Sequence, residues 1–221
     1  MICTHGRSGS TLLVDALRSM GIGRPGRHID INLIQDLTLE GIQSHLESKC
    51  KDGIIGVRVE WTYLIRISER ANINLSELFH VCLPDAKFIY LTRRDIVHQA
   101  LSRIKHDMLG RIHPRSESQW KQYKTLESQL KEVPVDAINA NIVRTVIASA
   151  AWEQFFRCLC VSPMRIEFES LLSDRTAVYE SVCEFIGVSA KQDGVEMTRS
   201  VHTAVNEAWH ATILEKYMRL F

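Results

Sequence analysis

The chain has 221 residues, of which 45% are hydrophobic and 24% are charged, and its formal net charge is +1. This ordinary composition excludes a disordered, collagen-like or disulfide-scaffold protein, and the small net charge argues against bulk binding to nucleic acid. No apolar run approaches the roughly 20 residues that span a bilayer, and no signal-peptide pattern opens the sequence. We therefore expect a cytoplasmic protein with one domain over residues 1–221.

Strands and helices are predicted to alternate along the chain. Strands are expected at residues 1–5, 54–61, 87–92 and 164–168, and helices at 11–20, 32–49, near 75–84, 96–109, 118–132, 136–160 and beyond the last strand. Such alternation is typical of a parallel sheet that is covered by helices on both faces. The predicted fold class is therefore α/β, with a helix-rich C-terminal half.

The segment between the first predicted strand and helix combines glycines with hydroxyl side chains. It consists of Gly6, Arg7, Ser8, Gly9, Ser10 and Thr11. A glycine loop that leads into a helix aims backbone N–H groups and the positive end of the helix dipole at one point, which suits a phosphate. Arg7 adds a permanent bidentate cation, and the three hydroxyls add donors. The alternative is a glycine-rich turn whose helix is capped by Ser10.

This loop differs from two common nucleotide-binding loops. Ser10 stands where G-x-x-x-x-G-K-[ST] has its lysine, and the pattern G-x-G-x-x-G is not matched. The strand at 87–92 runs into Arg93 and Arg94, not into an aspartate suited to Mg²⁺. These features disfavour a magnesium-dependent kinase or ATPase.

A second candidate anion site follows the strand at 87–92. Arg93 and Arg94 stand at its carboxyl end, where open α/β sheets bind their ligands, and Ser102 follows eight residues after Arg94. Alone, the two arginines could simply be a solvated strand end. In combination with the glycine loop, they predict a ligand with two separate phosphate groups.

No metal-binding pattern is found in the sequence. The six cysteines have no zinc spacing, and their single C-x-C pair, Cys158 and Cys160, would point about 200° apart on a helix. We therefore predict no metal.

Two runs of the sequence resemble the donor-binding elements of sulfotransferases. I-C-T-H-G-R-S-G-S-T-L-L is similar to their 5′-phosphosulfate loop, and F-I-Y-L-T-R-R-D-I-V-H-Q-A-L-S is similar to their 3′-phosphate element. The form of the second run most resembles the bacterial trehalose 2-sulfotransferase-like group, as do G-V-R-V-E-W at 56–61, F-E-S-L-L at 168–172 and N-E-A-W at 206–209. The resemblance implies a P-loop-like three-layer fold, 3′-phosphoadenylyl sulfate (PAPS) as donor, 3′,5′-adenosine bisphosphate (PAP) as product, and a homodimer.

The resemblance also implies roles for individual residues. The 5′-phosphosulfate would be held by Arg7, Ser8, Gly9, Ser10 and Thr11. The 3′-phosphate would be held by Ser102 and one arginine, which the spacing to Ser102 identifies as Arg94 and the strand end as Arg93. Arg58 stands where the family has a lysine and could meet charge on the bridging oxygen or the sulfonate; alternatively it is an ordinary exposed arginine.

The catalytic base is where the chain departs from the family pattern. The trehalose-type group is expected to carry a glutamate after the first helix, shortly beyond a Gly-x-Pro, and this sequence has none there. Glu60 is one candidate, because it lies two residues after Arg58. This spacing matches the Lys-x-His arrangement of cytosolic sulfotransferases, with Arg58 in place of the lysine and Glu60 in place of the histidine. His28 is another, because its ordinary pKa of about 6.5 suits base catalysis. Asp30, or no functional base, completes the alternatives.

These features predict a metal-independent sulfotransferase that acts on a carbohydrate or glycolipid-type hydroxyl. A catalytically weak or inactive relative that binds PAPS or PAP is the alternative, and a P-loop kinase-like enzyme is less favoured. Basic residues beyond Ser102 could line an opening for an anionic acceptor or form a solvated face; they are Arg103, Lys105, His106, Arg111, His113 and Arg115. Trp152 and Trp209 lie in helical patterns and are expected in the core.

Overall fold

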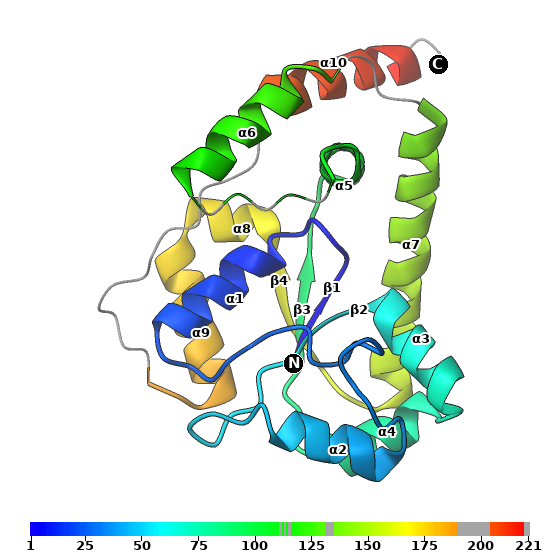
Figure 1. The fold of residues 1–221 in the computed structure, drawn as a ribbon, viewed down its shortest axis with the longest axis vertical. Helices are drawn as coiled ribbons and strands as arrows, with labels where there is room; N and C mark the ends of the chain where they lie inside the picture. Colours follow the sequence, from blue (N-terminus) through cyan, green and yellow to red (C-terminus); the bar gives the residue numbers. More distant parts are fainter. Residues whose placement is uncertain (111, 113, 115, 131–134, 190–203, 219–221) are drawn as a thin grey trace. The chain divides into compact units, whose positions relative to one another are not determined.

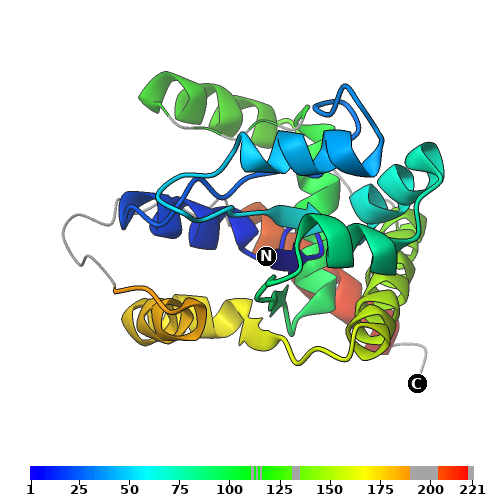
Figure 2. The ribbon, with the colours of Figure 1, turned by 90° about the horizontal axis from the view of Figure 1, so that it is seen from below.

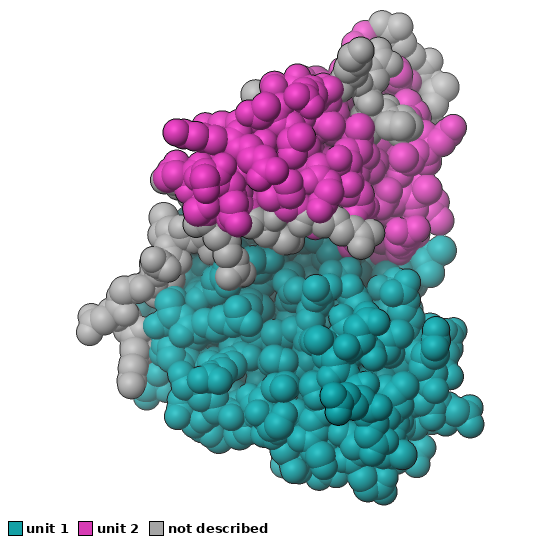
Figure 3. Space-filling model, viewed as in Figure 1, with its two compact units in different colours: residues 1–94, 147–198 teal, residues 95–146, 199–221 magenta. Residues whose placement is uncertain are grey.

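The computed structural model describes residues 1–110, 112, 114, 116–130, 135–189 and 204–218. The chain divides into two compact units (Figure 3). Unit 1 consists of Met1–Arg94 and Ile147–Thr198, and unit 2 consists of Asp95–Val146 and Arg199–Phe221. The expectation of one domain stays a prediction.

Unit 1 contains a four-stranded parallel sheet in the order β2-β1-β3-β4. Its strands are β1 (Ile2–Thr4), β2 (Arg58–Glu60), β3 (Ile89–Thr92) and β4 (Met164–Glu167). Thr4, the last residue of β1, lies opposite Glu60 in β2 and Leu91 in β3. The segments that leave β1, β2 and β3 therefore start at one edge of the sheet, and the predicted parallel α/β fold is confirmed.

Helices cover both faces of this sheet, which gives three layers (Figures 1 and 2). Side chains alternate along a strand, so Ile2, Ile89 and Leu91 join one hydrophobic core and Cys3, Val59 and Tyr90 join the other. The first core includes α1 (Ser10–Ser19), α8 (Phe168–Ser173) and α9 (Arg175–Ile186). The second includes α2 (Leu39–Glu47), α3 (Trp61–Ala71), α4 (Leu75–Cys82) and the part of α7 (Val135–Cys158) that contains the fully buried Trp152.

The structure corrects two of the predicted elements. The helix expected at 32–49 begins only at Leu39, because Thr38 adopts an extended backbone and its Oγ1 accepts a hydrogen bond from Gly41 N as a helix cap. The strand expected at 54–61 is limited to β2, and helix α3, which the sequence analysis missed, follows it directly. The β-branched residues that precede β2 resemble a longer strand, so the expected strand extended to Trp61, although Trp61, Leu64 and Ile67 follow helical spacing on the buried face of α3.

Unit 2 is helical in the part that the structure describes. It contains α5 (Ile96–Met108), α6 (Glu117–Glu127), residues 135–146 of α7 and α10 (Ala204–Met218). Leu101, Ile138, Trp209 and Ile213 are central to its core, as expected for Trp209. None of the described helices of the chain is both long and apolar enough to cross a membrane.

Lys105 is buried in unit 2, with 1% of its surface exposed. Its ammonium group forms an ion pair with Glu127 at 2.8 Å and donates a hydrogen bond to Asn206. Both partners are also buried. The prediction that Lys105 belongs to a solvated face or to an opening for the acceptor is therefore wrong. Three other residues of that predicted basic group lie outside the described residues: Arg111, His113 and Arg115.

Candidate functional site

The loop after β1 has a backbone that is suited to an anion. Arg7 adopts φ 71° and Gly9 φ 84°, so two of its residues are in the left-handed region. Left-handed residues within a turn gather neighbouring backbone N–H groups into a concave anion-binding surface. The loop leads into α1, whose N-cap is Gly9 and has no side-chain cap, so the alternative of a helix capped by Ser10 is wrong.

The loop requires glycine at position 9 for two reasons. Its positive φ disfavours any residue with a Cβ, and a Cβ at this position would lie only 2.4 Å from Phe168 Cδ2. Phe168 is the first residue of α8, directly after β4. The loop and the end of β4 are therefore in close contact through Gly9.

Ser8 holds the shape of the loop from inside. Its side chain is fully buried, its Oγ donates to the His5 carbonyl at 2.8 Å, and it shares a short hydrogen bond with Thr4 Oγ1. These bonds occupy the Ser8 hydroxyl within the protein. What Ser8 can offer an anion is thus its backbone N–H.

His5 anchors the start of the loop, a role that the sequence analysis missed. Its Nε2 lies 3.0 Å from Tyr90 Oη in β3 and 3.0 Å from Ser149 Oγ in α7. Burial raises the pKa of Tyr90, so its phenol keeps its proton for this network. The Trp152 indole also donates to the Thr4 carbonyl at 3.4 Å. A polar residue next to a glycine loop was the only sequence signal for these contacts.

Arg58 and Glu60 point toward the face of the sheet on which α1 lies. Val59 between them is buried in the opposite core, so alternation places both side chains on the α1 side. Arg58 Nη1 donates a hydrogen bond to Thr11 Oγ1 at 3.3 Å. Burial lowers the pKa of Arg58, while the charge of Glu60 opposes this shift. Arg58 is therefore half-buried beside the loop helix, and the alternative of an ordinary exposed arginine is wrong.

The two arginines after β3 have different surroundings. The guanidinium of Arg93 lies over the Phe168 ring, 4.7 Å from its centroid, and the same ring contacts Gly9. Arg94 is exposed and forms an ion pair with Glu167 at 2.5 Å, while its backbone N–H donates to Glu169 at 3.1 Å. The structure thus brings Arg93, but not the Arg94 side chain, next to the ring that borders the loop.

The other two candidate bases already make hydrogen bonds in the segment before α2. His28 Nε2 lies 2.8 Å from the Arg24 carbonyl, which can only accept, so this nitrogen carries the hydrogen. Asp30 is buried, and its Oδ1 accepts from the backbone and side-chain nitrogens of Asn32, both at 3.0 Å. Asp30 therefore acts as a turn residue, and His28 could accept a proton only at Nδ1.

Ser102 belongs to unit 2, whereas all the residues above belong to unit 1. It lies on α5 and is buried, with 9% of its surface exposed. Its assignment to a phosphate still depends on the sequence pattern.

The fold and the loop define an α/β protein that has a glycine loop at the carboxyl end of β1, one of the two inner strands of its sheet. Residues 36–213 match the family model of the Stf0 sulphotransferases. This range is most of the sequence, and the chain belongs to this sulfotransferase family, in agreement with the resemblance to the trehalose 2-sulfotransferase-like group. The glycine loop precedes the matched range. A search of curated proteins gives no match.

Proposed function

We propose that the protein transfers a sulfonyl group from PAPS to a hydroxyl of a carbohydrate or glycolipid-type acceptor. The observation that carries this proposal is the loop after β1, bordered by Phe168 and Arg93, in a chain of the Stf0 family. In the sheet order β2-β1-β3-β4 the ligand crevice of an open α/β sheet is expected beside β1 and β3, where this loop and Arg93 begin.

The loop is proposed to hold the 5′-phosphosulfate. Backbone N–H groups of residues 6–11, the N-terminus of α1 and the Arg7 guanidinium supply positive charge. The hydroxyls of Ser10 and Thr11 add donors, and the Ser8 hydroxyl keeps the loop in shape. The 3′-phosphate is assigned to Arg93, because Glu167 and Glu169 already occupy Arg94. Ser102 is its proposed second ligand from the sequence pattern.

Transfer is proposed to be an in-line displacement at sulfur. The acceptor oxygen forms a bond to sulfur, the bond from sulfur to the bridging phosphate oxygen breaks, and PAP leaves with that electron pair. Positioning and charge stabilisation supply most of the rate enhancement in such reactions. Arg58, whose guanidinium lies beside Thr11 of the loop helix, and Arg7 are proposed to stabilise the charge on the bridging oxygen and the sulfonate.

Glu60 is the preferred base, and it takes the acceptor proton. It stands at the last position of β2, opposite the last residue of β1, and thus at the edge from which the loop departs. His28 is the second candidate, through Nδ1. The chain lacks the glutamate that the trehalose-type group is expected to carry after the first helix. The alternative function is therefore binding of PAP or PAPS with little turnover. A homodimer stays a prediction of the resemblance.

Calorimetric titration with PAP, in parallel with ATP and magnesium, tests this proposal. We expect micromolar binding of PAP and no preference for ATP. Arg7→Ala should weaken PAP binding at least tenfold, because a charged hydrogen bond contributes roughly 1.5–3 kcal/mol. Arg66→Ala, at an exposed position of α3, is the matched control and should bind as the wild type does. ATP binding alone would support the kinase-like alternative, and PAP binding without transfer to any sugar would support the inactive relative.

A further inference from the structure

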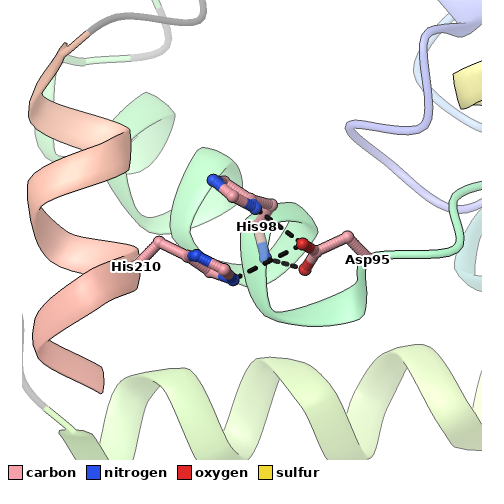
Figure 4. Close-up of side chains that lie close together, drawn as sticks. All are labelled: Asp95, His98 and His210. Carbon is pink, nitrogen blue, oxygen red and sulfur yellow. Dashed lines mark hydrogen bonds and ion pairs between the residues drawn. The ribbon is translucent and has the colours of Figure 1, made fainter. Parts of the chain in front are cut away.

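A cluster of one carboxylate and two imidazoles lies in unit 2 (Figure 4). Asp95 is the N-cap of α5, His98 is in the first turn of α5, and His210 comes from α10. Asp95 Oδ2 lies 2.7 Å from His98 Nδ1 and 3.4 Å from His210 Nε2. Each of the three residues offers one ligand atom that lies within 4.8 Å of the other two.

We propose that Asp95, His98 and His210 form a binding site for a divalent transition-metal ion of the zinc class, which fastens α10 to α5. Nothing in the proposed sulfonyl transfer uses this site. It is a structural or regulatory site, and it is independent of the donor assignment.

The donor set suits such an ion. Imidazole nitrogens and one carboxylate oxygen are preferred ligands of zinc and its neighbours, and three protein ligands leave a fourth position for water. The two carboxylate oxygens of Asp95 have different surroundings: Oδ1 accepts the hydrogen bond from His98 N, whereas Oδ2 faces both imidazoles and is the oxygen that would coordinate the ion.

Helix capping explains only part of the cluster. Asp95 accepts from His98 N at 2.8 Å, which is an ordinary N-cap bond. This cap does not need His210, which stands more than 100 residues away in the sequence, yet His210 stacks on His98 with ring centroids 3.7 Å apart. The convergence of two separate helices on one carboxylate is what points to a ligand.

Glu207 is in a position to orient the His98 ring, as a carboxylate commonly does for a histidine that binds a metal. Its Oε1 lies 3.6 Å from His98 Nε2, one helical turn before His210 on α10. An ion at His98 Nδ1 replaces the hydrogen there, so a neutral ring carries its hydrogen on Nε2, facing Glu207. When the ion binds, the two stacked rings must also turn so that a nitrogen of each faces the ion. The NMR chemical shifts of His98 and His210 should therefore change on binding.

The test uses the untagged full chain after removal of metals with a chelator. Titration with Co²⁺, followed by its visible absorption, and with Zn²⁺, followed by thermal unfolding, should show one ion per chain. Zn²⁺ should raise Tm by several degrees, because it binds only the folded site. His210→Ala should weaken binding at least tenfold and reduce the Tm shift at the same Zn²⁺ concentration. His80→Ala, an exposed histidine in α4, is the control and should change neither.

Asp95→Asn separates metal binding from helix capping. Asparagine caps a helix about as well as aspartate but brings no negative charge, so the variant should fold normally and lose most of the affinity for Co²⁺. The proposal is overturned if the wild type binds no ion, or if Asp95→Asn and His210→Ala bind Co²⁺ as tightly as His80→Ala does. Either result would leave a capped helix with a stacked histidine pair.

Discussion

Arg58 Nη1 donates a hydrogen bond to Thr11 Oγ1 at 3.3 Å, which links the first residue of β2 to the second residue of α1. This contact places a half-buried guanidinium beside the loop that is proposed to hold the donor. The same strand ends at Glu60, whose charge opposes the burial effect on the pKa of Arg58. A cation and a candidate base thus stand on one face of a three-residue strand.

Replacement of Arg58 should affect turnover more than donor binding. If Arg58 stabilises charge that develops during transfer, Arg58→Ala should lower kcat by roughly 10²–10³, the usual cost of removing one such group. Arg58→Lys keeps the charge and should restore part of the rate. The measurement is kcat alongside the Kd for PAP; an unchanged kcat in Arg58→Ala would assign Arg58 to loop support alone.

The two arginines after β3 should behave differently although they are neighbours. Arg93→Ala should weaken PAP binding roughly 10- to 100-fold, because it would remove the charged hydrogen bond that we propose to the 3′-phosphate. Arg94→Ala removes an exposed ion pair with Glu167, and such pairs contribute little. Calorimetry on both variants decides the assignment. A larger loss in Arg94→Ala would reverse it.

Glu60 and His28 can be separated by isosteric changes. Glu60→Gln keeps the size of the side chain but cannot accept the acceptor proton, so kcat should fall roughly 10²–10⁴-fold with the Kd for PAP nearly unchanged. His28→Gln should have a small effect, because His28 Nε2 is bonded to the Arg24 carbonyl. Rate measurements at saturating donor give the answer. Full activity in Glu60→Gln together with a large loss in His28→Gln would assign the base to His28.

The sequence predicted much of the sheet because its signals are local. Short apolar runs identified the regions of β1 and β3, the alternation of apolar and charged residues in M-R-I-E identified β4, and the glycine spacing identified the loop. The preference for Arg93 over Arg94 as the ligand of the 3′-phosphate could not be predicted from the sequence. It depends on contacts with Phe168 and Glu167, which lie more than 70 residues further along the chain. Helix α3 was missed because the strand-like residues 54–61 lead directly into it, with no glycine or proline between β2 and the first turn of the helix.

Contacts between distant polar residues were also invisible in the sequence. Lys105 stands in a basic stretch whose pattern is typical of a solvated face, yet inside unit 2 Glu127 neutralises its charge and Asn206 accepts a hydrogen bond from it. His98 and His210 are isolated histidines until α5 and α10 bring them to one carboxylate. Periodicity describes which face of a helix is apolar, but it does not tell which polar partner will meet a charge there.

Removal of one partner of the buried Lys105–Glu127 pair should destabilise the protein strongly. Lys105→Ala leaves the Glu127 carboxylate buried without its cation, and the loss of one partner of a buried pair costs roughly 3–5 kcal/mol. Lys105→Met with Glu127→Gln removes both charges and should cost much less. Urea unfolding of both variants measures the difference. Equal stabilities for the single and double variants would mean that the unpaired Glu127 carboxylate does not destabilise the fold.

The contact between Gly9 and Phe168 should be detectable as a coupling between the two positions. Gly9→Ala puts a Cβ 2.4 Å from Phe168 Cδ2 and also forces alanine into a left-handed conformation, which costs roughly 1–2 kcal/mol by itself. Phe168→Ala removes the clashing ring but not the backbone strain. In the double variant the clash is absent and the strain remains, so its loss of stability should be smaller than the sum of the two single losses.

A double-mutant cycle in urea, combined with PAP titration, separates these contributions. Phe168→Ala alone should also weaken PAP binding, because the ring supports the Arg93 guanidinium at 4.7 Å. Gly9→Ala should weaken PAP binding because the loop backbone shifts, and the second substitution should not restore it, since the ring that supports Arg93 is then gone. Additive losses of stability would show that the loop and the end of β4 are not in contact in solution.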